Sequence, residues 1–365
     1  MQPTRYASLA PVEHPVGLAD GLVSSIVYLG DCAPVTAVRG TSAAAQGREA
    51  PLDLIEEHLT FTSPETLYRR ATHGGVLVKN WFVPEDWSGT GGDLKHVLKI
   101  QPLGAAGYEA TIRLVDMDHI GDAVLNGGKR GKRKVPDVVS VENMQKAACR
   151  AKRQMRLLTK NMMADHLVTF TKREAEGSVY STPEQWAHDW DRFRRLLTKV
   201  IGDFPYVAIL EKHAKGNYHL HVAWCGRVAV GLVRKIWLAV IGGGSGCGNI
   251  DAKHIKVPSG ADRASRIARY ISKYVSKHFE DSPRFNKKRY WSSRQTLEEA
   301  RRYVLTADTL DGAVEQMRRM LGLDFSKFAV VVNGKLKTEG VFLFPDGSGL
   351  WLSYNPDLHA VDPPF

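Results

Sequence analysis

Within residues 142–278, amphipathic helical patterns alternate with short apolar segments rich in β-branched residues. Apolar side chains three or four positions apart predict a helix, whereas a short apolar run bounded by turn residues predicts a buried strand. The predicted order is helix, strand, helix, strand, strand, helix, strand, helix, at residues 142–162, 166–171, 183–200, 206–210, 218–224, 230–240, 250–255 and 261–278. This order predicts an α+β domain with a mainly antiparallel sheet flanked by helices.

The helix predicted at residues 183–200 has a clear start signal. Thr182, Pro183 and Gln185 fit a capping box with proline at the first helical position. Its apolar stripe is predicted to be core, and consists of Trp186, Trp190, Phe193, Leu197 and Val200.

The ends of the chain are less regular. We expect an irregular segment over residues 1–60, strands at 76–78 and 111–115, a helix around 297–305, and two hairpins turning at Asn333-Gly334 and Asp346-Gly347. The predicted organisation has three parts. They are an N-terminal region of unknown role (1–140), a central domain (141–294), and a C-terminal appendage of a helix and β-hairpins (295–365).

Positive charge is concentrated in two stretches of the 365-residue chain, whose net charge is +11. Residues 129–160 carry eleven Lys and Arg against two acids, and residues 263–302 carry twelve against four. Clustered cations favour a nucleic-acid partner, although two solvated basic helix faces are the alternative. No apolar run is long enough for a transmembrane helix, and no secretory signature is evident. Four scattered cysteines predict a reducing cytoplasm without a disulfide framework.

The strand predicted at 218–224 carries two histidines with strand periodicity. His219 and His221 share one face, and Glu211 lies near them across a short turn. Two imidazoles and a carboxylate could hold a metal ion while leaving positions open for water or a substrate oxygen. The alternative is a pair of half-buried histidines with ordinary hydrogen bonds.

The helix predicted at 261–278 presents two tyrosines side by side. At about 100° per residue, one arc carries Tyr270, Lys273, Tyr274 and Lys277, and the adjacent arc is apolar. Each tyrosine is followed by a lysine three positions later. Taken alone, this pattern also suits an amphipathic helix with tyrosines at its core boundary.

Together these motifs resemble the HUH endonuclease superfamily, in particular two-tyrosine rolling-circle replication initiators of single-stranded-DNA phages and related plasmids. The strand at 167–171 resembles the family's first motif, His219-Leu220-His221 its His-apolar-His motif, and Tyr270, Lys273 and Tyr274 its Tyr-x-x-Lys-Tyr motif. The motifs occur in the family's order, and the resemblance covers about residues 142–294. It implies that the central domain is a nicking and joining catalytic domain.

The resemblance implies an endonuclease with strand-transfer activity at a replication origin. Mg²⁺ or Mn²⁺ would be held by His219, His221 and Glu211. Tyr270 or Tyr274 would attack the phosphodiester, which leaves a 5′-phosphotyrosine and a free 3′-OH for synthesis, and the lysines would favour the phenolate. The sequence does not indicate which tyrosine acts first.

Basic residues of the helix at 142–162 are expected to hold the single-stranded DNA by its phosphates; they are Arg150, Lys152, Arg153 and Arg156. Further expected partners are a helicase and a polymerase of the bacterial host, in its cytoplasm. The alternatives are a two-tyrosine transposase, a relaxase, or a non-catalytic DNA-binding regulator. Relaxases usually carry their tyrosine before the histidines, so the motif order counts against that class.

Overall fold

The computed structural model describes residues 76–78, 80–84, 94–117, 141–173, 181–213, 216–227, 229–243, 246–257, 261–281, 290–332, 335–338 and 340–359. By internal contacts the chain divides into two compact units, Met1–Ala45 and Gln46–Phe365, and every described residue belongs to the second. The irregular segment predicted at 1–60 and the basic run at 129–134 lie outside the described residues.

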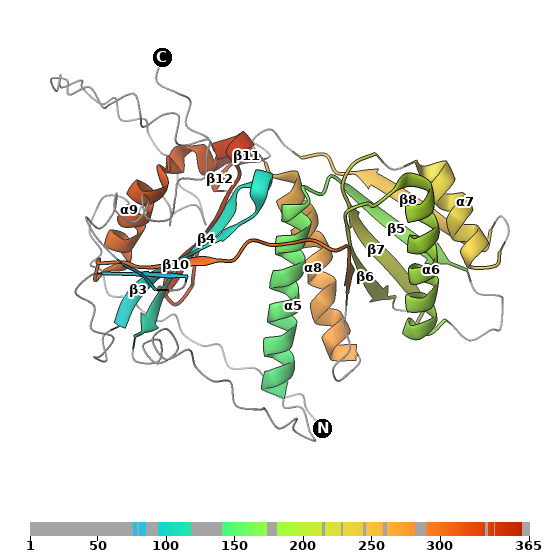
Figure 1. Ribbon diagram of the computed structural model, residues 1–365, viewed down its shortest axis with the longest axis horizontal. Coiled ribbons are helices and arrows are strands. Elements are labelled where there is room, and N and C mark those ends of the chain that lie inside the picture. The colour runs from blue at the N-terminus through green and yellow to red at the C-terminus, as the bar shows by residue number, and fades with distance from the viewer. Residues whose placement is uncertain are drawn as a thin grey trace, which may run out of the picture. The chain divides into compact units, whose positions relative to one another are not determined.

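A five-stranded antiparallel sheet forms the middle of the described chain (Figure 1). Its strands, in spatial order, are β8 (Gly248–His254), β5 (His166–Lys172), β7 (Tyr218–Trp224), β6 (Tyr206–Lys212) and β9 (Trp291–Ser292). The first four were predicted from the sequence. The turn between β6 and β7 makes them direct neighbours, with Glu211 opposite His219.

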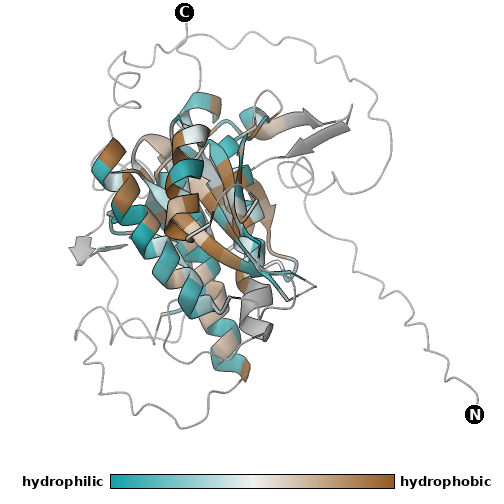
Figure 2. Cartoon of the chain, turned by 90° about the vertical axis from the view of Figure 1, so that its right-hand side faces the viewer, coloured by the Kyte–Doolittle hydropathy of each residue, from teal (hydrophilic) through white to brown (hydrophobic). Residues whose placement is uncertain are grey.

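Helices cover both faces of this sheet (Figure 1). On one face lie α6 (Pro183–Ile201) and α7 (Val230–Val240), and on the other lie α5 (Val141–Asn161) and α8 (Arg263–Asp281). Polar and apolar residues alternate along the helices in Figure 2, as expected for elements with one buried face. The prediction of an α+β fold with a mainly antiparallel sheet flanked by helices is confirmed.

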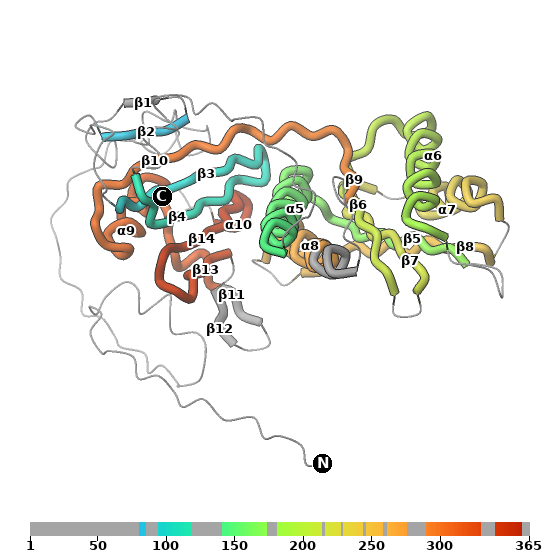
Figure 3. The backbone as a smooth tube through the Cα atoms, turned by 90° about the horizontal axis from the view of Figure 1, so that it is seen from below, coloured from blue at the N-terminus to red at the C-terminus, as the bar shows by residue number. Residues whose placement is uncertain are grey.

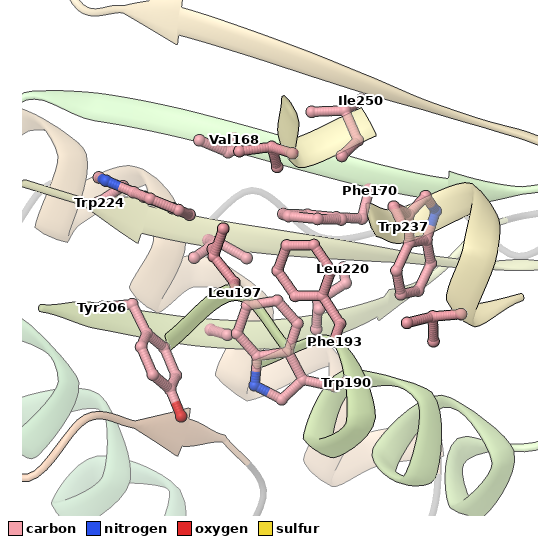
Figure 4. Packing of buried hydrophobic residues seen from close by; sticks show 14 of the residues in the cluster. Val168, Phe170, Trp190, Phe193, Leu197, Tyr206, Leu220, Trp224, Trp237 and Ile250 are labelled. Carbon is pink, nitrogen blue, oxygen red and sulfur yellow. The ribbon is translucent and has the colours of Figure 1, made fainter. Parts of the chain in front are cut away.

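The core between the sheet and α6 is dominated by aromatic side chains (Figure 4). Trp190 and Phe193 of α6 pack edge-on against Phe170 of β5. The predicted capping box is confirmed: the Gln185 amide donates to the Thr182 hydroxyl, and the Thr182 amide donates to the Gln185 side chain. Four of the five predicted stripe residues are buried, while Val200 is 59% exposed.

A second, seven-stranded sheet combines segments from both sides of the first one. Its order is β1 (Val76–Val78), β2 (Trp81–Val83), β10 (Arg301–Val304), β3 (Leu94–Pro102), β4 (Tyr108–Asp116), β14 (Gly349–Tyr354) and β13 (Val341–Leu343). All neighbours are antiparallel except β2 and β10, which are parallel. One face packs on α9 (Leu310–Leu321), which buries Leu98, Tyr303 and Met317 in a common core.

The helix predicted around 297–305 is wrong, because β10 occupies residues 301–304 of that range. Figure 3 shows β10 between β2 and β3. Tyr303 faces the core shared with α9, whereas Arg302 lies on the opposite face. Strand β3 was not predicted, since apolar residues occupy both of its faces and hide the alternation.

Both predicted hairpins are confirmed. β11 (Ala329–Val332) pairs with β12 (Lys335–Thr338), and β13 pairs with β14. The second hairpin is not separate from the N-terminal region, because β14 pairs with β4 along its whole length. The remaining elements are a short helix, α10 (Pro356–His359), and two 3-10 turns, η1 (Gly104–Ala106) and η2 (Phe325–Phe328).

Helix α5 joins the two sheets through a buried ionic cluster. Glu109 of β4 lies 2.7 Å from Arg156 and 3.2 Å from Lys160, and Lys160 is only 1% exposed. Burial alone would raise the pKa of Glu109, but Lys160 and Arg156 together hold it below its ordinary value. Leu157 of the same helix packs with Leu103 and Ala106.

Candidate functional site

His221 lies on the face of β7 that α8 covers. Its Nε2 is 2.7 Å from Oε2 of Glu211, and its Nδ1 is 3.2 Å from the hydroxyl oxygen of Thr169 on β5. The side chain is 8% exposed. Burial lowers the pKa of His221, and the nearby Glu211 carboxylate offsets part of that effect. Both ring nitrogens are therefore held in a defined orientation.

His219 lies on the same face, directly opposite Glu211 in the strand register. Its Nε2 is 3.4 Å from the Asn217 side-chain nitrogen, and its ring centroid is 5.3 Å from that of His213. Burial lowers the pKa of His219, and the neighbouring imidazoles of His213 and His221 lower it further. A lowered pKa keeps this imidazole neutral near pH 7.

Glu211, His219 and His221 share a face without forming a closed metal site. Among the described residues, no three His, Cys, Asp or Glu side chains converge closely enough to hold a metal ion. The donor chemistry does fit a divalent cation, since imidazole nitrogen and carboxylate oxygen are both suitable ligands. The direct approach of His221 to Glu211 fits two ligands that face a common point.

The two tyrosines of α8 lie against this group. The ring of Tyr274 stacks on His221, with centroids 4.9 Å apart and planes 13° apart. Tyr270 stands edge-on to Tyr274, with centroids separated by 5.4 Å. The apolar arc of α8, which includes Ile267 and Ile271, is buried against the sheet and fixes this orientation. The histidine and tyrosine motifs therefore meet at one place.

The two phenols differ in their surroundings. Tyr274 is 5% exposed, whereas Tyr270 is 40% exposed. Burial raises the pKa of Tyr274 well above its ordinary value, and a hydrogen bond with Tyr270 and the nearby Glu211 carboxylate raise it further. The Lys273 ammonium lies 4.9 Å from the centroid of each tyrosine ring. The side chain of Lys277 lies outside the described residues.

The four basic residues expected on α5 have different environments. Arg156 makes two hydrogen bonds to the Glu109 carboxylate, of 2.9 and 2.7 Å. Arg153 is exposed and lines a cavity together with Arg156. Arg150 is exposed and Lys152 is half-buried. The structure thus brings two of the four to one cavity.

Sequence analysis missed Thr169, which contacts His221 from the neighbouring strand. The signal was present in the pattern, because Thr169 alternates with the buried Val168 and Phe170 and so lies on the opposite face of β5. Its importance depends on the pairing of β5 with β7, which places Thr169 opposite His221.

Residues 165–279 match a family model for a replication-associated protein of the ORF2 type. The matched segment, under half of the chain, extends from the start of β5 into α8 and contains both tyrosines, both histidines and Glu211. No match to the chain was found among curated proteins or among solved structures. No helix in the described part of the chain is long and apolar enough to span a membrane. The family match supports a DNA-binding protein of replication initiation.

Proposed function

We propose that this protein initiates rolling-circle replication by cutting one DNA strand at an origin and later rejoining it. One observation carries the proposal: Tyr274 stacks on His221, whose Nε2 meets Glu211, and Tyr270 stands beside them. Nucleophile candidates and a possible metal-binding group therefore share one site. This site lies within the segment that matches the replication-associated family.

A divalent cation, Mg²⁺ or Mn²⁺, is part of this proposal. His221, Glu211 and His219 would hold it, and when bound it would polarise the phosphodiester and offset the charge of its oxygens. The lowered pKa values of both histidines keep their lone pairs available near neutral pH. Thr169, next to Nδ1 of His221, would orient that ring as the outer partners of ligating histidines do.

Tyr270 would act first, because its phenol is the accessible one. Its oxygen forms a bond to phosphorus while the bond from phosphorus to the 3′ oxygen breaks. The phenol loses its proton, the 3′ oxygen gains one, and a 5′-phosphotyrosine and a free 3′-OH result. Lys273 would stabilise the phenolate electrostatically. Rejoining is the reverse step, and Tyr274 would serve a second cleavage.

The test is cleavage of labelled single-stranded origin DNA with Mn²⁺, scored as a covalent protein–DNA adduct. We expect Tyr270→Phe to reduce the adduct more than Tyr274→Phe, and the double variant to abolish it. Tyr218→Phe is the matched control, because Tyr218 packs on the core at the opposite face of the same sheet. Full adduct formation by the double variant would contradict the proposal, and salt-dependent binding without any adduct would indicate a non-catalytic regulator.

The proposal also has a cellular consequence. A free 3′-OH is a primer end, so a polymerase of the host must extend it and a helicase must separate the strands ahead of it. We place this activity in the cytoplasm of a bacterial host. A two-tyrosine transposase would form the same adduct without needing the 3′ end to be extended, so extension of the nicked end distinguishes the two classes.

A further inference from the structure

A basic cavity of about 1060 Å³ lies between the seven-stranded sheet and helices α5 and α8. Cationic side chains from five elements line it, including Lys99, Arg113, Arg153, Arg266, Arg269 and Arg302. None of the described lining residues is Asp or Glu. A concave surface with a single sign of charge concentrates anions from solution.

The floor of the cavity is a row of side chains that crosses six strands. The strand register places Trp81, Arg302, Lys99, Thr111, Trp351 and Phe342 side by side, one from each of β2, β10, β3, β4, β14 and β13. All six line the cavity. Two cations and a hydroxyl thus lie between aromatic side chains at both ends of the row.

The cations at the centre of this row lack balancing charge. Burial and the neighbouring Arg153 and Arg302 lower the pKa of Lys99 to about 8. Burial also lowers the pKa of Arg302, with Glu299 offsetting part of that effect. Arg156, by contrast, is neutralised by Glu109. A bound anion would relieve the repulsion around Lys99.

Aromatic rings accompany the cations throughout the cavity. Arg113 lies 4.5 Å above the Phe344 ring and Arg302 lies 5.3 Å from the Trp81 ring. Phe342 is 52% exposed, which is a high value for so large an apolar side chain. Cations that follow a backbone together with rings that stack on bases are the combination used to bind single strands. In a duplex the bases already stack on one another and are not available to these rings.

Helix α8 connects this cavity to the tyrosines. Arg266, Arg269 and Ser272 line the cavity, while Tyr274 of the same helix stacks on His221. Arg269 is the neighbour of Tyr270 in the sequence. A strand bound by its phosphates in the cavity would therefore reach Tyr270 along the length of one helix.

We propose that the cavity between the seven-stranded sheet and α5 and α8 binds the single-stranded DNA that flanks the cleaved bond. In this role the cations at the centre of the row hold phosphates, and the aromatic side chains at its ends stack on unpaired bases. The inference deepens the proposed function and rests on it for the identity of the DNA. It assigns a role to strands from both ends of the chain, outside the segment that matches the family.

The first test measures single-stranded oligonucleotide binding to the full chain by fluorescence anisotropy over a range of salt. We expect the double variant Lys99→Gln and Arg302→Gln to weaken binding at least about tenfold. We also expect the slope of log K against log salt to fall by about 1.4, since each phosphate contact on a single strand contributes about 0.7. The matched control is Arg227→Gln with Lys235→Gln, two exposed cations outside the cavity. Equal loss in both double variants would overturn the proposal.

The second test examines stacking through Phe342→Ala. Because this ring is half exposed, its removal leaves the core intact, which a thermal melt will verify. We expect about fivefold or greater loss of affinity for a normal oligonucleotide and no difference for an abasic strand of equal length. Equal loss on both strands, or tighter binding of a duplex than of the single strand, would contradict the proposed stacking.

The two proposals can fail separately. If wild-type protein forms no covalent adduct but the cavity variant still loses single-strand affinity, the cavity assignment stands and the nicking activity is wrong. If the adduct forms and the cavity variant binds and cleaves like wild type, the reverse holds.

Discussion

The two sheets of this protein differ in what their faces contact. The five-stranded sheet has helices on both faces, and β6 is buried over most of its length, from Tyr206 to Leu210. The seven-stranded sheet packs on α9 with one face and presents much of the other to a basic cavity. A sheet held from both sides can fix reactive side chains in one orientation. A sheet with one open face offers a broad surface for a chain-like ligand.

The two sheets also differ in how they are assembled from the sequence. Four strands of the first come from the continuous stretch 166–254, whereas the second joins strands from residues 76–116 with strands from 301–354. The first is therefore recognisable as a motif-bearing segment, and it is the one that matches a known family. The comparison suggests that chemistry and binding reside on different sheets, which the following variants test.

The largest expected effect separates the chemistry from the binding. We expect His221→Ala to reduce adduct formation more than about 100-fold, because losing even an outer partner of a metal ligand costs 10–100-fold. The affinity for single-stranded DNA should not change. His254→Ala, an exposed histidine on β8 of the same sheet, is the control. A parallel loss of affinity in His221→Ala would show that the two sheets do not divide these tasks.

The next effect concerns the ionic cluster that joins the sheets. We expect Glu109→Leu to lower the free energy of unfolding by about 3–5 kcal/mol, because it leaves Lys160 buried without its partner. Urea denaturation measures this change. Replacing Lys160 by Leu as well should recover much of the loss. Glu315→Leu removes a more exposed carboxylate from α9 and should cost less than about 1 kcal/mol.

A smaller effect is expected from pH. Lys99, which faces Arg302 on β10 and Arg153 on α5, has a pKa of about 8 in the free protein. A bound phosphate would raise that pKa, so binding takes up a proton and affinity falls as the pH rises through 8. We expect a loss of up to about tenfold between pH 7 and 9, since one unit above the pKa leaves about a tenth of the lysine charged.

The control for this pH effect is Lys99→Arg, because arginine stays protonated over the whole range. Its affinity should be nearly constant between pH 7 and 9. The same pH slope in Lys99→Arg as in wild type would assign the effect to another group.

The smallest effect is confined to the five-stranded side. Thr182→Ala removes the side-chain cap of α6 and should cost about 1 kcal/mol of unfolding free energy. Cleavage and DNA affinity should remain at wild-type values, because α6 packs on the face of the sheet that points away from His221. A change in either activity would indicate that the two faces are coupled.

Much of the candidate site was predictable because its spacings follow local rules. Alternation along β7 places His219 and His221 on one face, and helical periodicity places Tyr270 beside Tyr274. The closed three-ligand set did not follow from these rules. His221 meets Glu211 in the structure, whereas His219 lies beside Asn217 and His213. Side-chain rotation, which no spacing specifies, makes this difference.

The prediction failed where the structure depends on distant partners. The segment around Glu298 and Ala300 has helix-favouring residues, yet Arg301–Val304 forms a strand because β2 and β3 pair with it on both sides. Such pairing is a tertiary effect that overrides local propensity.

Periodicities of two and 3.6 residues sufficed to place the histidines, the tyrosines and most elements of the middle of the chain, since they depend only on backbone geometry. The basic cavity required the packed fold. Trp81 and Arg302 are more than two hundred positions apart and become neighbours only when both strands bury their opposite faces against α9. The burial of a shared core, rather than any local preference, brings such residues together.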